Sequence, residues 1–179
     1  MRWRCVTAAW ASCVLLLPAT RVLAEDDPTA RDQPAVIIDA VREVAADPTT
    51  YAPAVLNYTA MRLDWASSQP FFRNGYVEDN PRFTRTGLTH DVPISYGAGN
   101  RRILNDALLV VPTSLANNAA IRITERMLTD RFPSQRTLIR TLSWIERVSV
   151  ASYLSYRLSA AHFRQWRANV RRADQLGLR

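Results

Sequence analysis

The sequence contains no lysine, so all 23 of its Lys-plus-Arg positions are arginine, which we attribute to codon bias and not to a binding preference. Cysteine is almost as scarce: Cys5 and Cys13 are the only two. Both lie in a segment that we expect to be cleaved off. A mature chain without cysteine has no disulfide and no thiolate zinc site.

Several catalytic signatures are also missing. The chain has no P-loop, no HExxH, no Gly-x-Ser-x-Gly and no dinucleotide-binding glycine pattern. We therefore expect no cofactor, assign no catalytic residue and assign no metal ligand. The enzyme question stays open at this point, with a protein without chemistry of its own favoured.

The amino terminus resembles a secretory signal in layout. Arg2 and Arg4 precede an apolar run that ends at Leu17, and small residues close the segment at Ala24. We predict that residues 1–24 are a signal peptide; the alternative is an uncleaved membrane anchor. The protein is then exported to the periplasm or envelope, with an integral membrane position still open.

Loss of such a signal would lower the formal net charge from +7 to +4. We predict that residues 25–33 form a flexible leader, because the segment is acidic and contains proline. Residues 34–179 are then one helical domain, long enough for a core of its own.

Residues 134–177 predict one very long helix. No proline interrupts the segment, Ser134 can cap its start, and Gly177 can end it in a left-handed conformation. At about 1.5 Å per residue the helix would run on the order of 60 Å, so part of it must project, break, pair with another chain or lie at a membrane. Residues at steps of three and four predict its buried stripe. They are Leu138, Leu142, Ile145, Val148, Ser152, Tyr156, Ser159, Phe163, Trp166 and Val170.

Three earlier helices are expected at about 34–47, 49–68 and 101–131, with proline near their ends and Asn100 as the cap of the third. Their predicted apolar stripes are Ile37, Ile38, Val41, Val44 and Ala45; Tyr51, Ala54, Val55, Tyr58, Met61 and Trp65; and Ile103, Leu104, Leu108, Val111 and Leu115. Residues 69–100 hold too much proline and glycine for a long helix, but their aromatic residues indicate an ordered loop. The fold class that follows is all-α: an irregular bundle of about four helices with a very long C-terminal helix and a long ordered loop (69–100).

Two segments, 103–121 and 138–161, have lengths that would suit a membrane span. Both contain charged residues, and each charge near the bilayer centre costs roughly 2.5–3.5 kcal/mol. A ridge of Ala151, Ser155 and Ser159 permits close backbone approach in lipid as well as in water. We favour a soluble or surface-associated bundle; a multi-span protein and an oligomer zipped through the long helix are the alternatives.

One cluster of polar residues could carry a function. A carboxylate near a helix end faces a loop with a second carboxylate and an amide, and such oxygens can bind a ligand or a hard cation. The alternative, which we favour, is that these residues only brace the loop. The cluster comprises Asp64, Ser67, Ser68, Glu78, Asn80 and Pro81.

These residues stand in the pattern D-x-x-S-S followed by G-x-V-E-x-N-P, from Asp64 to Pro81. The pattern resembles a signature of small uncharacterised bacterial integral-membrane or envelope proteins. The resemblance covers about 20 residues and has Ser where Thr is usual. It implies a helical envelope or membrane protein and supplies no reaction.

The chain has two histidines. His90 precedes Asp91 in the loop, and it could join Asp64 and Glu78 around a cation in a metal-dependent hydrolase. His162, in the predicted long helix, is assigned to packing.

Our first hypothesis is an exported envelope protein with a structural or interaction role. The alternatives are that hydrolase and a peripheral binder of anionic lipid that uses the arginine-rich C-terminal turns; the same arginines could instead oppose the helix dipole. As partners we expect a membrane surface or another envelope protein and no nucleic acid. The long helix also offers a surface for a homo-oligomer.

Overall fold

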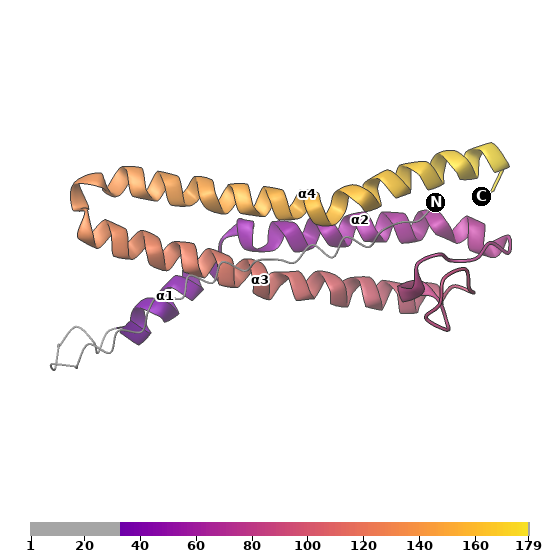
Figure 1. The fold of residues 1–179 in the computed structure, drawn as a ribbon, viewed down its shortest axis with the longest axis horizontal. Coiled ribbons are helices and arrows are strands. Elements are labelled where there is room, and N and C mark those ends of the chain that lie inside the picture. Colours follow the sequence, from indigo (N-terminus) through magenta and orange to yellow (C-terminus); the bar gives the residue numbers. More distant parts are fainter. Residues whose placement is uncertain (1–32, 179) are drawn as a thin grey trace, which may run out of the picture. The chain divides into compact units, whose positions relative to one another are not determined.

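The computed structural model describes residues 33–178, which belong to one compact unit and confirm the all-α fold class. The helices are α1 (Gln33–Ala45), α2 (Pro48–Arg73), α3 (Tyr96–Arg131) and α4 (Arg136–Leu176), with short 3₁₀ helices η2 (Pro81–Phe83) and η3 (Pro133–Gln135) (Figure 1). The predicted signal peptide, and the predicted leader as far as Asp32, lie outside the described residues.

Local sequence explains most of the helix ends. The Asp47 carboxylate accepts a hydrogen bond from the Thr49 N–H, 2.9 Å away, and so caps α2. The hydroxyl of Ser95 caps α3, so the expected cap at Asn100 is wrong. Gly177 ends α4 at a φ of 66°, as predicted, whereas Ser134 lies in η3 and does not cap α4.

The connection between α2 and α3 is shorter than expected at both ends. Helix α2 continues through Pro70 to Arg73, and α3 begins at Tyr96, five residues before the expected start. Residues 74–95 nevertheless form an ordered loop, because η2 and two isolated antiparallel bridges fix its course. The described residues contain no β-strand beyond these two bridges.

An aromatic cluster anchors this loop to the bundle. Trp65 of α2 stacks on Phe83 of η2 with ring centroids 5.1 Å apart, and Met61 and Ile103 complete the buried cluster. Gly99 of α3 is required here, because a Cβ at this position would lie 2.3 Å from a ring carbon of Trp65. The loop therefore has a fixed position against α2 and α3.

The three long helices run side by side (Figure 1). Helix α2 packs against both α3 and α4, α3 also packs against α4, and α1 packs against α3. The turn through η3 reverses the chain between α3 and α4 (Figure 1). The great length of α4 is thus matched by long neighbours, and α4 does not project alone.

The predicted buried stripe of α4 is wrong over its first half. Leu138, Leu142, Ile145 and Tyr156 are between 46% and 66% exposed. The buried positions of α4 are mostly small or polar, because small side chains let the helix backbones approach closely. They are Ile139, Ser143, Arg147, Ala151, Ser155, Ser159 and Ala173.

The same correction applies to the other helices. Ala54, Met61 and Trp65 of α2, Val44 of α1 and Ile103 of α3 are buried as predicted. Other large residues of the predicted stripes are exposed, and small or polar side chains occupy the interior beside them. The exposed ones are Ile37, Ile38, Val41, Tyr51, Val55, Tyr58, Leu104 and Leu108.

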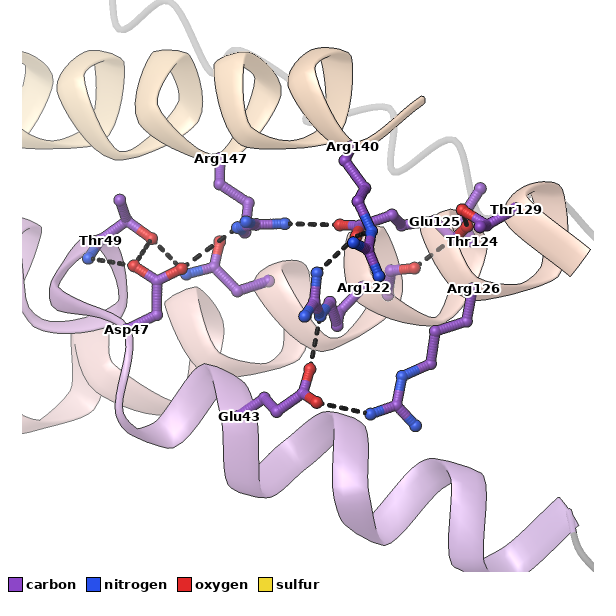
Figure 2. Close-up of polar contacts among 12 residues, drawn as sticks. Glu43, Asp47, Thr49, Arg122, Thr124, Glu125, Arg126, Thr129, Arg140 and Arg147 are labelled. Carbon is purple, nitrogen blue, oxygen red and sulfur yellow. Dashed lines mark hydrogen bonds and ion pairs between the residues drawn. The ribbon is translucent and has the colours of Figure 1, made fainter. Parts of the chain in front are cut away.

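A network of ion pairs, which runs from the interior to the surface, joins the four helices (Figure 2). The Arg147 guanidinium of α4 donates to Glu125 of α3 and to Asp47 at the start of α2, each at 3.2 Å. Arg122 donates to Glu125 and also to Glu43 of α1, the latter at 2.6 Å. Glu125 is only 3% exposed, so its charge requires these partners.

None of the helices within residues 33–178 combines the length and the apolar character that a membrane crossing needs.

Candidate functional site

A cavity of about 570 Å³ lies between the second half of α2, the last third of α4 and the loop after α2. Its walls combine aromatic rings with polar and charged side chains. Of the predicted cluster, Asp64, Ser68, Glu78 and Asn80 line it directly. The sequence pattern therefore does bring most of its members to one place.

Asp64 is the centre of the polar wall. Its Oδ2 lies 2.8 Å from Nδ1 of His162, and its Oδ1 lies 3.3 Å from Nδ2 of Asn169. The Asp64 side chain is 19% exposed and that of His162 is 30% exposed. Both partners come from α4, so this contact connects α2 to α4 across about a hundred residues of sequence.

Ser67 and Ser68 form hydrogen bonds with both Asp64 and Asn169. Each hydroxyl donates to the Asp64 carbonyl oxygen one helical turn earlier, at 2.8 and 3.1 Å. Each hydroxyl oxygen also accepts from Asn169 Nδ2, at 3.2 and 3.0 Å. Ser67 does not line the cavity, and both hydroxyls are engaged in holding α4 in place.

The loop supplies the opposite wall of the cavity. Glu78 pairs with Asp91 through two backbone hydrogen bonds, and its Oε1 accepts from the Asn80 N–H at 2.8 Å. Burial raises the pKa of the Glu78 carboxyl; the Asn80 N–H opposes the rise, and the negative charges of Asp64 and Asp79 add to it. Asp64 and Glu78 therefore face one cavity, and the charge of Asp64 contributes to the raised pKa of the Glu78 carboxyl.

The remaining predicted residues lie outside the cavity lining. Pro81 begins η2, and the Asn80 side chain caps that turn by accepting from the Arg82 N–H at 3.1 Å. His90, at a φ of 58°, has its Nδ1 3.5 Å from the Asp79 carboxylate, and both side chains are well exposed. The set Asp64, Glu78 and His90 is thus not assembled. Within residues 33–178, no three His, Cys, Asp or Glu side chains are grouped so as to hold a metal ion.

Sequence reasoning missed His162 as a site residue. It pairs with Asp64 in place of His90, although it was assigned to packing. A signal was present, because His162, Gln165, Asn169 and Arg172 follow one another at steps of three, four and three and so share one helix face. All four line the cavity. This polar stripe on the longest helix is the sequence feature that indicates a site at His162.

A second surface feature is the outer face of α4, by which we mean Leu138, Leu142, Ile145, Tyr153 and Tyr156. These side chains are between 46% and 66% exposed. They recur at helical spacing, so they form one apolar strip on the side away from α2 and α3. Ser149 and Ser152, which are also exposed, interrupt this strip between Ile145 and Tyr153. Exposed single apolar residues are ordinary, but several on one helix face make that face a candidate interaction surface.

Arginines continue this strip toward the C-terminus. Arg167 and Arg171 come eleven and fifteen residues after Tyr156, close to three and four helical turns, so they share its helix face, and Arg157 and Arg164 lie beside them. All four are exposed, and none of them forms an ion pair with another described residue. An arginine-rich segment of α4, with the exposed Asp174 at its end, therefore follows the apolar outer face.

Comparison with known proteins identifies no relative: no family model, no curated protein and no solved structure matches the chain.

Proposed function

We propose that the protein is an envelope-associated interaction module that binds the anionic surface of a lipid bilayer through the outer face of α4. The observation that carries this proposal is the placement of large and small side chains on α4. Small and polar residues such as Ser143 and Ser155 are buried, whereas Leu142 and Tyr156 are exposed. A helix with an apolar face and flanking arginines is suited to lie in the interface of a membrane.

The arginine charges favour an anionic lipid surface over a second copy of the chain as the partner. Arginine near an anionic bilayer contributes about 1 kcal/mol per residue at low salt. A second copy docked in parallel on the same face would bring two arginine-rich segments together, and like charges repel. An anionic lipid surface instead attracts Arg167 and Arg171 while the apolar strip inserts. The signal-like layout of residues 1–24 supports a place in the envelope, where such surfaces occur.

Co-sedimentation of the full chain with vesicles tests the proposal. We expect binding to vesicles that contain phosphatidylglycerol, weaker binding to pure phosphatidylcholine, and loss of binding as NaCl is raised. The double substitution Arg167→Gln and Arg171→Gln should weaken binding roughly thirtyfold at low salt, from about 1 kcal/mol for each arginine. Arg73→Gln, at an exposed arginine of α2, is the matched control and should leave binding unchanged.

The apolar half is tested in the same assay. Leu142→Gln with Ile145→Gln should abolish most of the binding, because these side chains would no longer enter the interface. Leu109→Gln on α3 is the control, since Leu109 is 71% exposed and lies off the outer face.

Sedimentation velocity separates lipid binding from self-association. If the chain is a dimer that Leu142→Gln with Ile145→Gln converts to a monomer, and no vesicle binding is seen, the outer face joins two copies and the proposal is wrong. Binding that is insensitive to both salt and the arginine substitutions would also refute it.

A further inference from the structure

The cavity beside Asp64 lies on a different part of the molecule from the outer face of α4 and is independent of the proposed lipid binding. Its charged lining consists of Asp64 from α2, Glu78 and Asp79 from the loop, and His162 and Arg172 from α4. Three carboxyl groups therefore line the cavity against one guanidinium. The cavity thus has an acidic character.

Beside these charged groups and the polar side chains of Ser68, Asn80, Gln165 and Asn169, the lining is aromatic and apolar. Phe71 and Phe72 end α2, and Tyr76 follows them in the loop, with its ring packed edge-on against Phe71 at 5.6 Å. Trp65 and Phe83 form the floor of the same region. Aromatic rings attract cations through their faces and offer an apolar surface to a ligand body.

We propose that this cavity binds a small organic cation, an ammonium or guanidinium group carried on an apolar body. Carboxylates accept the N–H groups of such a ligand, and the rings cover its hydrocarbon part. A simple anion would meet Glu78 and Asp79, and a hydrated metal ion brings no apolar surface to the rings. Within the described chain, no cluster suited to a metal competes with this assignment.

Glu78 gives the binding a pH dependence. Its pKa is raised by burial, with the charges of Asp64 and Asp79 adding to the rise. A bound cation would offset those charges and favour the ionised carboxylate, so binding should tighten as pH rises through the raised pKa and should release a proton. His162 and Arg172 also face this region from α4, and the Asp91 backbone pairs with Glu78 from the loop.

Three probes of one shape and different charge test the proposal on the full chain: 2-phenylethylammonium, neutral 2-phenylethanol and anionic 3-phenylpropanoate. Titration followed by amide NMR should show saturable shifts for the ammonium probe at residues 64–80 and 162–172. The alcohol should bind more weakly, and the anion should not bind. Equal binding of all three, shifts elsewhere on the chain, or no binding of the ammonium probe would overturn the proposal.

The substitution Glu78→Gln tests whether the Glu78 carboxylate makes the cavity prefer a cationic ligand. It should weaken binding of the ammonium probe on the order of tenfold, the usual scale for a charged hydrogen bond, and should remove the pH dependence. Glu146→Gln, at an exposed carboxylate of α4, is the matched control and should leave both unchanged. Thermal melts of both variants establish that they are folded. Unaltered affinity and pH profile in a folded Glu78→Gln protein would refute the role of Glu78 and, with it, the proposed site.

Discussion

Removing Arg147 should destabilise the fold more than removing any exposed arginine of α4. Its side chain is only 10% exposed, and its guanidinium bridges Asp47 at the start of α2 and Glu125 in α3. The substitution Arg147→Ala leaves the 4% exposed side chain of Glu125 with Arg122 as its close partner. It also removes the guanidinium that pairs with Asp47, the carboxylate that caps α2.

The expected magnitude follows from these contacts. Removing one partner of a buried ion pair costs about 3–5 kcal/mol, because the remaining charge is left uncompensated. Glu125 keeps the hydrogen bond from Arg122, so the lower end, about 3 kcal/mol, applies here. For a domain of this size, 1 kcal/mol corresponds to about 2–4 °C, so Tm should fall by about 6–12 °C.

Thermal and urea unfolding followed by circular dichroism measure this loss. Arg157→Ala is the matched control, since it makes the same change at an exposed position of the same helix. It should alter stability by no more than about 0.5 kcal/mol. If Arg147→Ala has the same Tm and urea midpoint as this control, the ion-pair network does not hold the helices together and the reasoning fails.

Two further changes probe packing and charge. Gly99→Ala should lower stability by about 1–3 kcal/mol in thermal melts, because the new Cβ would clash with Trp65; in Gly97→Ala the nearest neighbour is 3.9 Å away, so a similar loss there would refute the steric explanation. The hydrogen bond from Arg122 is the main reason that the pKa of Glu43 lies below 4.5, so its stabilisation is present above that value and is lost as pH falls through the folded pKa. Glu43→Gln should therefore flatten the acid limb of the stability curve, and an unchanged limb would contradict this.

The sequence was sufficient to predict how many helices form and roughly where they end. Proline, glycine and capping residues act locally, so the ends near Pro48 and Gly177 follow from a few neighbouring residues. The gathering of Asp64 and Glu78 was also predictable, since Asp64 was expected near the end of its helix and Glu78 lies in the loop that follows. For His162 the sequence offers only the polar stripe on α4; its partner Asp64 lies far away in sequence, and the tertiary arrangement brings the two together.

The orientation of α4 was harder to predict, because two stripes with helical spacing compete on it. Leu138 and Leu142 begin the large apolar stripe, while Ile139 and Ser143, one residue later in each case, begin the buried one. One residue corresponds to about 100° of rotation around a helix. Hydrophobicity alone favours the first stripe, and nothing local to α4 signals that the second one is buried.

The ion-pair network accounts for this choice. Rotating α4 to bury Leu138, Leu142, Ile145 and Tyr156 would gain roughly 1 kcal/mol for each side chain, since these are already about half covered. The same rotation would carry Arg147 away from Glu125 and so cost about 3–5 kcal/mol. The free energy gained by burial and the free energy lost with the ion pair are of similar size. The close helix approach that the small residues allow therefore favours the observed orientation. The large apolar side chains consequently remain on the outside, where a surface other than the protein's own interior can take them up.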